Sequence, residues 1–293
     1  MRPITPSPSS SGAERGASSV ASLAELIPAE SAVDVGGVRI AYREAGAGEV
    51  VLLLHGIGSA ASSWRHQLAG LAGRYRLIAW DAPGYGGSGE VAQPHPVPAD
   101  YGELAVGLLD ALGVARCHLV GHSLGGLIAA SIARRHGARL MSLTLSAPAA
   151  GYGAKPGGKW PAPVQERLDD LSDLGPAGMA AKRASRMCAP GVRPEILDEA
   201  RAIMARVRPT GYGRASALLA QGDILADAPD ITVRAQVMVG AADIIAPVER
   251  CRAIAAAIAG ARFELLPGVG HASYLEDPAR YNAVLGAFIA GAA

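Results

Sequence analysis

The sequence is poor in the residue types that hold small or specialised proteins together. Its 293 residues include only two phenylalanines and three widely spaced cysteines, Cys117, Cys188 and Cys251. So few cysteines exclude a disulfide framework and a cysteine metal site. We therefore expect all three to be small buried side chains in a reducing compartment. Alanine, leucine and valine must fill the interior in place of aromatic residues.

The sequence also lacks an excess of either charge and any long apolar run. Lysine and arginine total 27 against 26 aspartates and glutamates, which gives a net charge of +1. This balance argues against a nucleic-acid-binding face or a polyanionic partner. No run is long and apolar enough to cross a membrane. Half of the residues are hydrophobic, which is enough for one large domain with an inserted subdomain.

The first thirty residues differ from the rest in composition. Residues 1–30 are rich in serine, proline, alanine and glycine, and they lack the uncharged apolar stretch of a signal peptide. We expect a flexible tail, in which residues 21–27 form at most one helical turn, and a cytoplasmic location.

From residue 31 the chain alternates between strand and helix patterns. Residues 32–34 and 38–44 are typical of an antiparallel hairpin, and the remaining strands are short apolar runs of the kind buried on both faces. Predicted helices separate these runs. Such alternation predicts an α/β fold with a mostly parallel central sheet and helices on both faces. The strands are expected at 50–54, 76–80, 117–120, 141–145, 236–239 and 262–266, and the helices at 64–71, 100–112, 124–130, 248–259 and 277–290.

The alternation stops after the sixth strand. A stretch rich in glycine and proline leads to three predicted helices, over 164–174, 177–187 and 194–207, with no strand between them. An all-helical insertion of this kind would lie over the carboxyl edge of the sheet, where such folds bind ligands. We therefore expect a helical cap over 148–226, inserted into a core formed by 31–147 and 227–293.

One serine stands at the end of a predicted strand. It is the centre of Gly121-His122-Ser123-Leu124-Gly125, between an apolar run and a stretch typical of a packed helix. A turn that pushes the Ser123 hydroxyl out of the sheet forces the neighbouring backbones together, and side chains at 121 and 125 would collide. The pattern indicates an exposed nucleophile.

Four motifs together resemble the α/β-hydrolase family, over nearly all of residues 32–290. They are His55-Gly56-Ile57-Gly58, the run Asp81–Ser88, the serine motif, and Gly270-His271, and they stand in the family's order. The resemblance implies a nucleophile, an acid and a histidine in the chain order Ser, Asp, His. It also implies that one oxyanion donor is the backbone N–H of Ile57.

A serine hydroxyl is a weak nucleophile near neutral pH and needs a base in contact with it. Among seven histidines, His271 alone follows a predicted strand and a flexible run, Pro267–Gly270, from which it can reach Ser123. His55 and His122 lie within glycine motifs and favour a role in shaping turns. The others are expected in a buried strand or on the surface: His118, His66, His95 and His136.

The orienting acid should accept the second N–H of the histidine and stabilise the imidazolium. Asp243 stands just past the strand at 236–239, at the same sheet edge, and Val239–Asp243 resembles the acid loop of the family. Helix capping explains the remaining candidates: Asp223, Asp227, Asp230 and Asp277. The residue after the nucleophile, Leu124, begins a helix and supplies a second oxyanion donor beside Ile57.

These residues predict hydrolysis of a carboxylic ester through a covalent acyl-enzyme, with a small-molecule substrate and no metal or cofactor. The alternatives are a carbon–carbon bond hydrolase of ring-cleavage products, a lactonase or acyltransferase on the same triad, and a non-catalytic ligand receptor. A serine nucleophile argues against the branches of the family that use aspartate. An intact triad argues against a receptor. The sequence leaves the oligomeric state open.

Substrate contacts are the least determined part of the site. We assign them to Gly56, His122, Trp160 and Tyr212, the last two from the cap. Between Arg167 and Arg208 the cap also carries seven arginines, and on helices of this kind we expect most of them to be solvated.

Overall fold

The computed structural model describes residues 27–291. The tail predicted over 1–30 therefore lies outside the described residues, except for its last four positions, and so does the helical turn predicted from residue 21. Residue 30 already belongs to the first strand, so the described part of the chain enters the sheet slightly earlier than expected.

Eight strands of the described chain form a single sheet in the order β1-β2-β4-β3-β5-β6-β7-β8. β1 and β2 form the predicted antiparallel hairpin, β2 also pairs antiparallel with β4, and every other pair is parallel. The strands are β1 Glu30–Val35, β2 Val38–Ala45, β3 Val50–Leu54, β4 Arg76–Trp80, β5 Cys117–His122, β6 Leu140–Ser146, β7 Ala235–Gly240 and β8 Arg262–Leu266.

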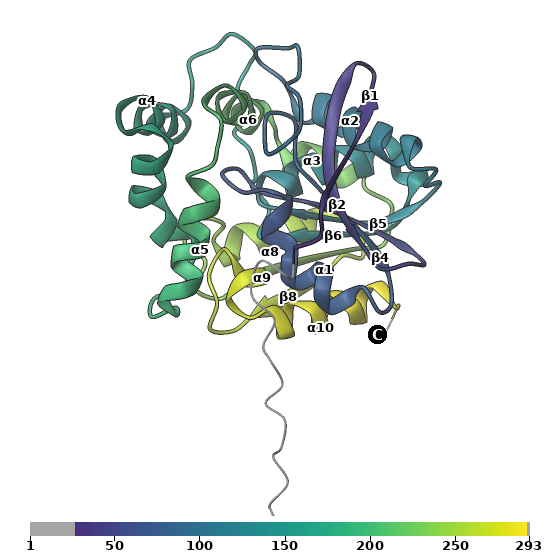
Figure 1. The fold of residues 1–293 in the computed structure, drawn as a ribbon. Coiled ribbons are helices and arrows are strands. Elements are labelled where there is room, and N and C mark those ends of the chain that lie inside the picture. The colour runs from purple at the N-terminus through teal and green to yellow at the C-terminus, as the bar shows by residue number, and fades with distance from the viewer. Residues whose placement is uncertain (1–26, 292–293) are drawn as a thin grey trace, which may run out of the picture.

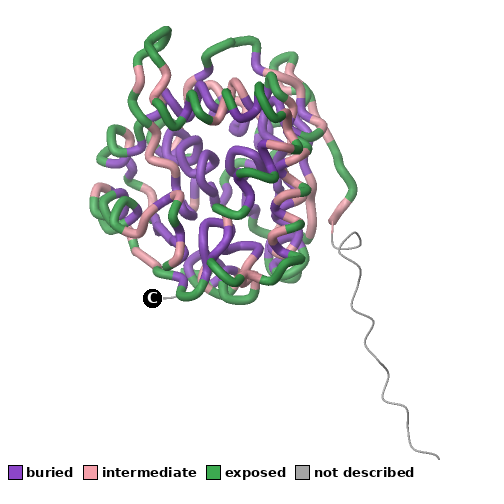
Figure 2. The backbone as a smooth tube through the Cα atoms, turned by 90° about the vertical axis from the view of Figure 1, so that its left-hand side faces the viewer, coloured by how far each residue is buried: buried purple, intermediate pink, exposed green. Residues whose placement is uncertain are grey.

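Helices cover both faces of the sheet (Figure 1). Side chains alternate along the buried β3 strand, so Leu52 packs into the core on one face and Leu53 into the core on the other. The first face carries α2 Pro98–Ala111, α3 Leu124–His136 and α8 Val248–Ala257, and the second carries α1 Arg65–Leu71, α9 Ser273–Glu276 and α10 Pro278–Ile289. Figure 2 shows buried backbone through the middle of the molecule and exposed backbone at its outer turns.

A helical segment, residues 148–226, lies between β6 and β7 as predicted. Its helices are α4 Ala162–Arg183, a 3-10 turn Ala184–Met187, α5 Pro194–Met204, α6 Pro209–Gln221 and most of α7 Ile224–Asp227. The first two predicted helices are the two halves of α4. They are separated at Gly175, where φ is +65°, and by Pro176, which cannot continue the hydrogen bonding of a helix.

The sequence did not reveal α6. The first turn of Pro209–Gln221 contains a threonine, two glycines and a tyrosine, whose intrinsic helix propensity is low. Packing against α2, α3 and α4 stabilises the helix instead. A side chain at Gly211 would come within 2.1 Å of the Gly84 carbonyl oxygen. The small residues are therefore required because the helix crosses close to the loop after β4.

No helix within residues 27–291 is long and apolar enough to span a membrane.

Candidate active site

The predicted nucleophile occupies a strained turn between β5 and α3. Ser123 has φ of +52°, one of only two non-glycine residues with positive φ in the described chain. A Cβ at Gly121 would lie 2.2 Å from the Gly125 carbonyl oxygen, and one at Gly125 would lie 2.2 Å from the Leu54 carbonyl oxygen. The two glycines are required for the reason that the sequence suggested. Strain of this kind persists where packing enforces it, and it is concentrated at functional sites.

His271 and Asp243 meet at the same edge of the sheet. The His271 ring donates from Nδ1 to Asp243 Oδ2 over 2.8 Å, and both side chains are buried. His271 follows β8 and Asp243 follows β7, which are neighbouring parallel strands, so their carboxyl ends bring the two loops together. A Cβ at Gly240 would lie 2.3 Å from the Gly270 carbonyl oxygen, which shows how closely these loops pack.

The second oxygen of Asp243 is held by the backbone. Oδ1 accepts hydrogen bonds of 2.8 Å from the N–H groups of both Ile245 and Ala246. Burial disfavours the charged carboxylate, but the attraction of His271 and these hydrogen bonds outweigh burial and lower the pKa of Asp243. Asp243 is therefore ionised and fixed in orientation near neutral pH, as an acid that aligns a histidine must be.

The remaining acids have structural roles. Asp223 caps α7 by accepting from the N–H groups of Leu225 and Ala226, and Asp277 caps α10 at Arg280, as predicted. Asp227 and Asp230 differ from the prediction, because both form ion pairs with Arg134 on α3. They secure the end of the helical segment to the core.

The two histidines within glycine motifs shape the backbone. His55 accepts the Ala82 N–H at Nε2 and donates from Nδ1 to the Gly56 carbonyl, and burial lowers its pKa. His122 donates from Nε2 to the His271 carbonyl oxygen over 2.9 Å. Burial, followed by the neighbouring His271, lowers the pKa of His122 to about 3. Neutral His122 therefore holds the His271 backbone without placing a fixed positive charge beside its ring.

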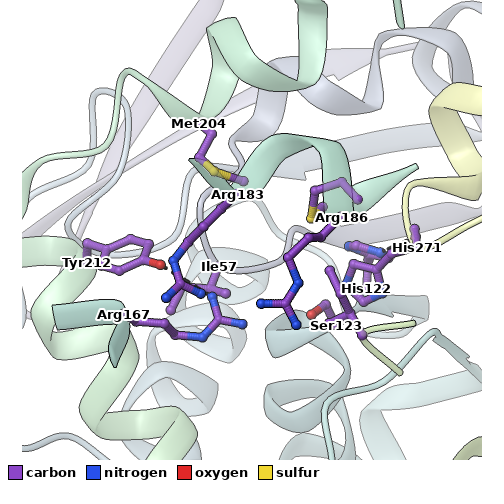
Figure 3. Close-up of a pocket in the computed structure, with 11 residues that line it drawn as sticks. Ile57, His122, Ser123, Arg167, Arg183, Arg186, Met204, Tyr212 and His271 are labelled. Atoms are coloured by element: carbon purple, nitrogen blue, oxygen red, sulfur yellow. Dashed lines mark hydrogen bonds between the residues drawn. The ribbon is translucent and has the colours of Figure 1, made fainter. Parts of the chain in front are cut away.

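Two adjoining pockets open onto Ser123 and His271, each with about 470 Å³ of empty space. They share Ile57, and Leu124 lines the second. Leu124 is the first residue of α3, so its backbone N–H has no acceptor within the helix. Core residues form one wall, and the helical segment forms the other with residues that include Met187, Met204 and Tyr212 (Figure 3).

The predicted substrate contacts have mixed outcomes. Tyr212 and His122 line the first pocket, although the His122 ring is engaged with the His271 backbone. Gly56 lies behind Ser123, and a Cβ there would come within 3.0 Å of the Ser123 side chain. The prediction for Trp160 is wrong. It lines a separate open groove with His95, where the two ring centroids are 5.7 Å apart.

The expectation that most arginines of the helical segment are solvated is wrong for Arg183, but it holds for the exposed Arg186, Arg193 and Arg206. Arg183 is buried, and Arg167, Arg183 and Arg186 all line the first pocket. Arg250, at the start of α8, lines the second. The sequence contains no signal for this arrangement, because the break in α4 and the turn after it determine which way these side chains point.

Sequence reasoning also missed Glu276 on α9. Its carboxylate accepts the N–H of Gly270, next to His271, over 2.9 Å and the N–H of Ala189, in the helical segment, over 2.8 Å. Burial raises the pKa of Glu276, and these two hydrogen bonds oppose that effect. Glu276 thus joins the histidine loop to the helical segment.

Comparisons with known proteins agree with the fold and the motifs. Residues 51–284 match the profile described as "Alpha/beta hydrolase family". A similar relative, "Putative carbamate hydrolase RutD" of Caulobacter vibrioides, is 30% identical over 257 residues, which cover 83% of this chain and 91% of that protein.

Two solved structures with high similarity carry the names of hydrolases. The enol-lactonase from Burkholderia xenovorans LB400 has a TM-score of 0.81 and 26% identity, covering 89% of this chain and all of that one. A thermophilic esterase from Thermogutta terrifontis, with malate bound, has a TM-score of 0.80 and 25% identity, covering 89% and 97%. These similarities support a hydrolase as the class of enzyme. With four-fifths of its length matched, the chain belongs to the alpha/beta hydrolase family.

Proposed function

We propose that this protein is a serine hydrolase that cleaves carboxylic esters of small molecules through a covalent acyl-enzyme. The observation that carries the proposal is the buried pair of His271 and Asp243, which opens onto the same pockets as Ser123. A histidine aligned by a carboxylate and facing a serine in a strained turn is the arrangement that activates a hydroxyl. The names of the relatives add weight, because lactones and carbamates also present a carbonyl bonded to oxygen.

In the proposed reaction, Ser123 Oγ attacks the ester carbonyl carbon as His271 Nε2 takes its proton. The negative charge that develops on the carbonyl oxygen is stabilised by the backbone N–H groups of Ile57 and Leu124. Collapse of this intermediate breaks the bond to the alcohol oxygen, which leaves with the proton from His271. Water then attacks the acyl-enzyme, again giving its proton to His271, and releases the acid and free Ser123.

The pair of Asp243 and His271 supports this cycle. Oδ2 accepts the Nδ1 proton, which leaves Nε2 free to act as the base, and the fixed carboxylate stabilises the imidazolium that forms. No hydrogen bond joins Ser123 Oγ to His271 within residues 27–291. Catalytic hydrogen bonds are often long without substrate and tighten when it binds.

We further propose that the helical segment, 148–226, acts as a cap. Its residues form one wall of the pocket from Arg167 to Tyr212, and the core forms the other. A cap of this kind excludes water from the acyl-enzyme and selects the substrate.

A fluorophosphonate probe and a panel of p-nitrophenyl esters test the proposal. We expect the probe to label the protein covalently at Ser123, with labelling and ester turnover both absent in Ser123→Ala. Lactones and ring-cleavage dienols belong in the panel, because they separate the alternatives that share the triad. Failure of the probe to label Ser123, together with no turnover of any ester, would favour a non-catalytic receptor.

A further inference from the structure

The pockets in front of Ser123 are lined by one sign of charge. Their lining residues include Arg167, Arg183, Arg186 and Arg250, and no aspartate or glutamate among the described residues lines either pocket. Asp243 lies behind His271 and is engaged by that ring and by two backbone N–H groups. The charged side chains that line the site are therefore all positive.

The four arginines are not equally neutralised. Arg183 forms ion pairs with Asp170 and Glu166, outside the pocket, and Arg250 is exposed on α8. Arg167 approaches only the neutral hydroxyl of Tyr212, at 3.4 Å. Arg186 is exposed at the mouth of the pocket and has no ion pair or hydrogen bond with any residue of the described chain. Figure 3 shows the guanidinium groups of Arg167, Arg183 and Arg186 pointing into one cavity, with Arg186 directed toward Ser123.

Arginines gathered around one cavity repel one another, and an anion bound among them offsets that repulsion. Guanidinium groups match carboxylates well, because two parallel N–H groups meet two oxygens. A positive cleft also raises the local concentration of anionic substrates and speeds their arrival. The arrangement is thus adapted to an ester that carries a negative charge.

Resting on the proposed function, we propose that the substrate is an ester bearing a carboxylate, which Arg186 and Arg167 bind while the ester carbonyl lies at Ser123. Arg183 is held by its ion pairs beside them and adds to the positive field. This assigns a binding role to residues of the helical segment and a chemical class to the substrate. The neutral aliphatic esters commonly used as test substrates would then be poor ones.

Two matched pairs of substrates test the proposal. The first compares the p-nitrophenyl monoester of glutaric acid with p-nitrophenyl pentanoate, and the second compares 4-acetoxybenzoate with 4-methylphenyl acetate. These pairs place the carboxylate on the acyl side and on the alcohol side respectively. We expect kcat/KM to be at least tenfold higher for the charged member of one pair. That preference should weaken as sodium chloride is raised from 50 to 500 mM, because salt screens the attraction.

Substitutions of the arginines then test whether these residues cause the preference for the charged esters. Arg186→Gln and Arg167→Gln should each reduce it about tenfold, mainly through KM, and Arg186→Lys should retain part of it. Urea unfolding of each variant shows that it is folded, and the ratio of kcat/KM for the charged ester to that for the neutral ester measures the preference. Arg201→Gln is the matched control, because Arg201 is on α5, pairs with Asp198 and lines neither pocket.

The outcomes separate this inference from the proposed function. Neutral esters hydrolysed through Ser123, with no charged ester preferred, would overturn the inference and leave the serine hydrolase intact. A preference that survives the double variant Arg167→Gln/Arg186→Gln would also overturn it. Absence of turnover for all four esters, with Ser123 unlabelled by the fluorophosphonate, would instead count against the proposed function itself.

Discussion

The carboxyl edge of the sheet and the helical segment above it are built in different ways. At the edge, the turn that carries Ser123 packs against the end of β3, and the loop that carries His271 packs against the end of β7. These close backbone contacts require glycines at 121, 125 and 240. In the helical segment, long charged side chains project from helices and from the turn after α4. Close backbone contacts fix the positions of the groups at the edge, whereas the segment presents charge and shape over a wider area. Under the two proposals, chemistry and substrate choice are carried by separate parts of the chain.

If this division is correct, removing a group at the edge should abolish turnover of every substrate. Changing the helical segment should alter which substrate is preferred.

The largest effect is expected for Ser123→Ala. The change removes one hydroxyl from a strained turn, so turnover should fall by about 10⁴ or more while stability holds or rises slightly. Ester hydrolysis by protein from an esterase-deficient host and a urea unfolding curve measure the two quantities. Residual activity comparable with that of the wild type would place the nucleophile elsewhere.

Asp243→Asn should come next. It retains the shape of the side chain but favours the wrong tautomer of His271, so kcat should fall by about 10⁴. Asp223→Asn and Asp227→Asn are the controls and should each cost less than about tenfold, because these residues cap α7 and pair with Arg134. A reversed ranking would move the acid to the end of the helical segment.

An intermediate effect is expected where the two regions meet, at Glu276. In Glu276→Gln a single amide oxygen replaces the two carboxylate oxygens that accept the Gly270 and Ala189 N–H groups. We expect kcat/KM to fall about tenfold for charged and neutral esters alike, and the free energy of unfolding to fall by about 1–2 kcal/mol. Glu249→Gln, on the exposed surface of α8, should change neither quantity. If only the preference between charged and neutral esters changed, Glu276 would contribute to substrate selection, as the helical segment does.

The smallest effect concerns acid stability. The pKa of His122 is lowered to about 3 by burial and by His271, against an ordinary value near 6.5. Below pH 6.5 the unfolded chain therefore binds a proton that the folded chain does not, and stability decreases as the pH falls toward 3. The slope approaches about 1.4 kcal/mol per pH unit for this residue.

Urea unfolding at pH 7, 6 and 5 measures that slope. His122→Asn should show a shallower dependence than the wild type, whereas His95→Asn, at an exposed loop position, should leave it unchanged. Equal slopes for all three proteins would mean that His122 takes up its proton without unfolding.

Much of the fold and of the candidate site could be predicted from the sequence, because the relevant signals are local. Apolar runs buried on both faces marked the parallel strands, and the glycines around Ser123 reported a turn with no room for side chains. His271 and Asp243 each follow a strand closely. Parallel strands end at one edge, so their order in the chain was enough to predict that these two residues meet.

Other features depended on contacts between distant parts of the chain. α6 begins with weak helix formers, and its packing against α2, α3 and α4 stabilises it. Trp160 is an aromatic residue in the predicted cap, yet its ring lies in a groove with His95.

The sequence by itself determined that this is an α/β protein with a serine, an aspartate and a histidine at one sheet edge. Strand patterns and tight turns depend on residues that are neighbours in the sequence. The tertiary structure alone decided which side chains of the helical segment face the pocket. An arginine on a helix has the same sequence pattern whether it meets solvent, an acid or a substrate. Its direction depends on the break at Gly175 and on the packing of the whole segment against the core.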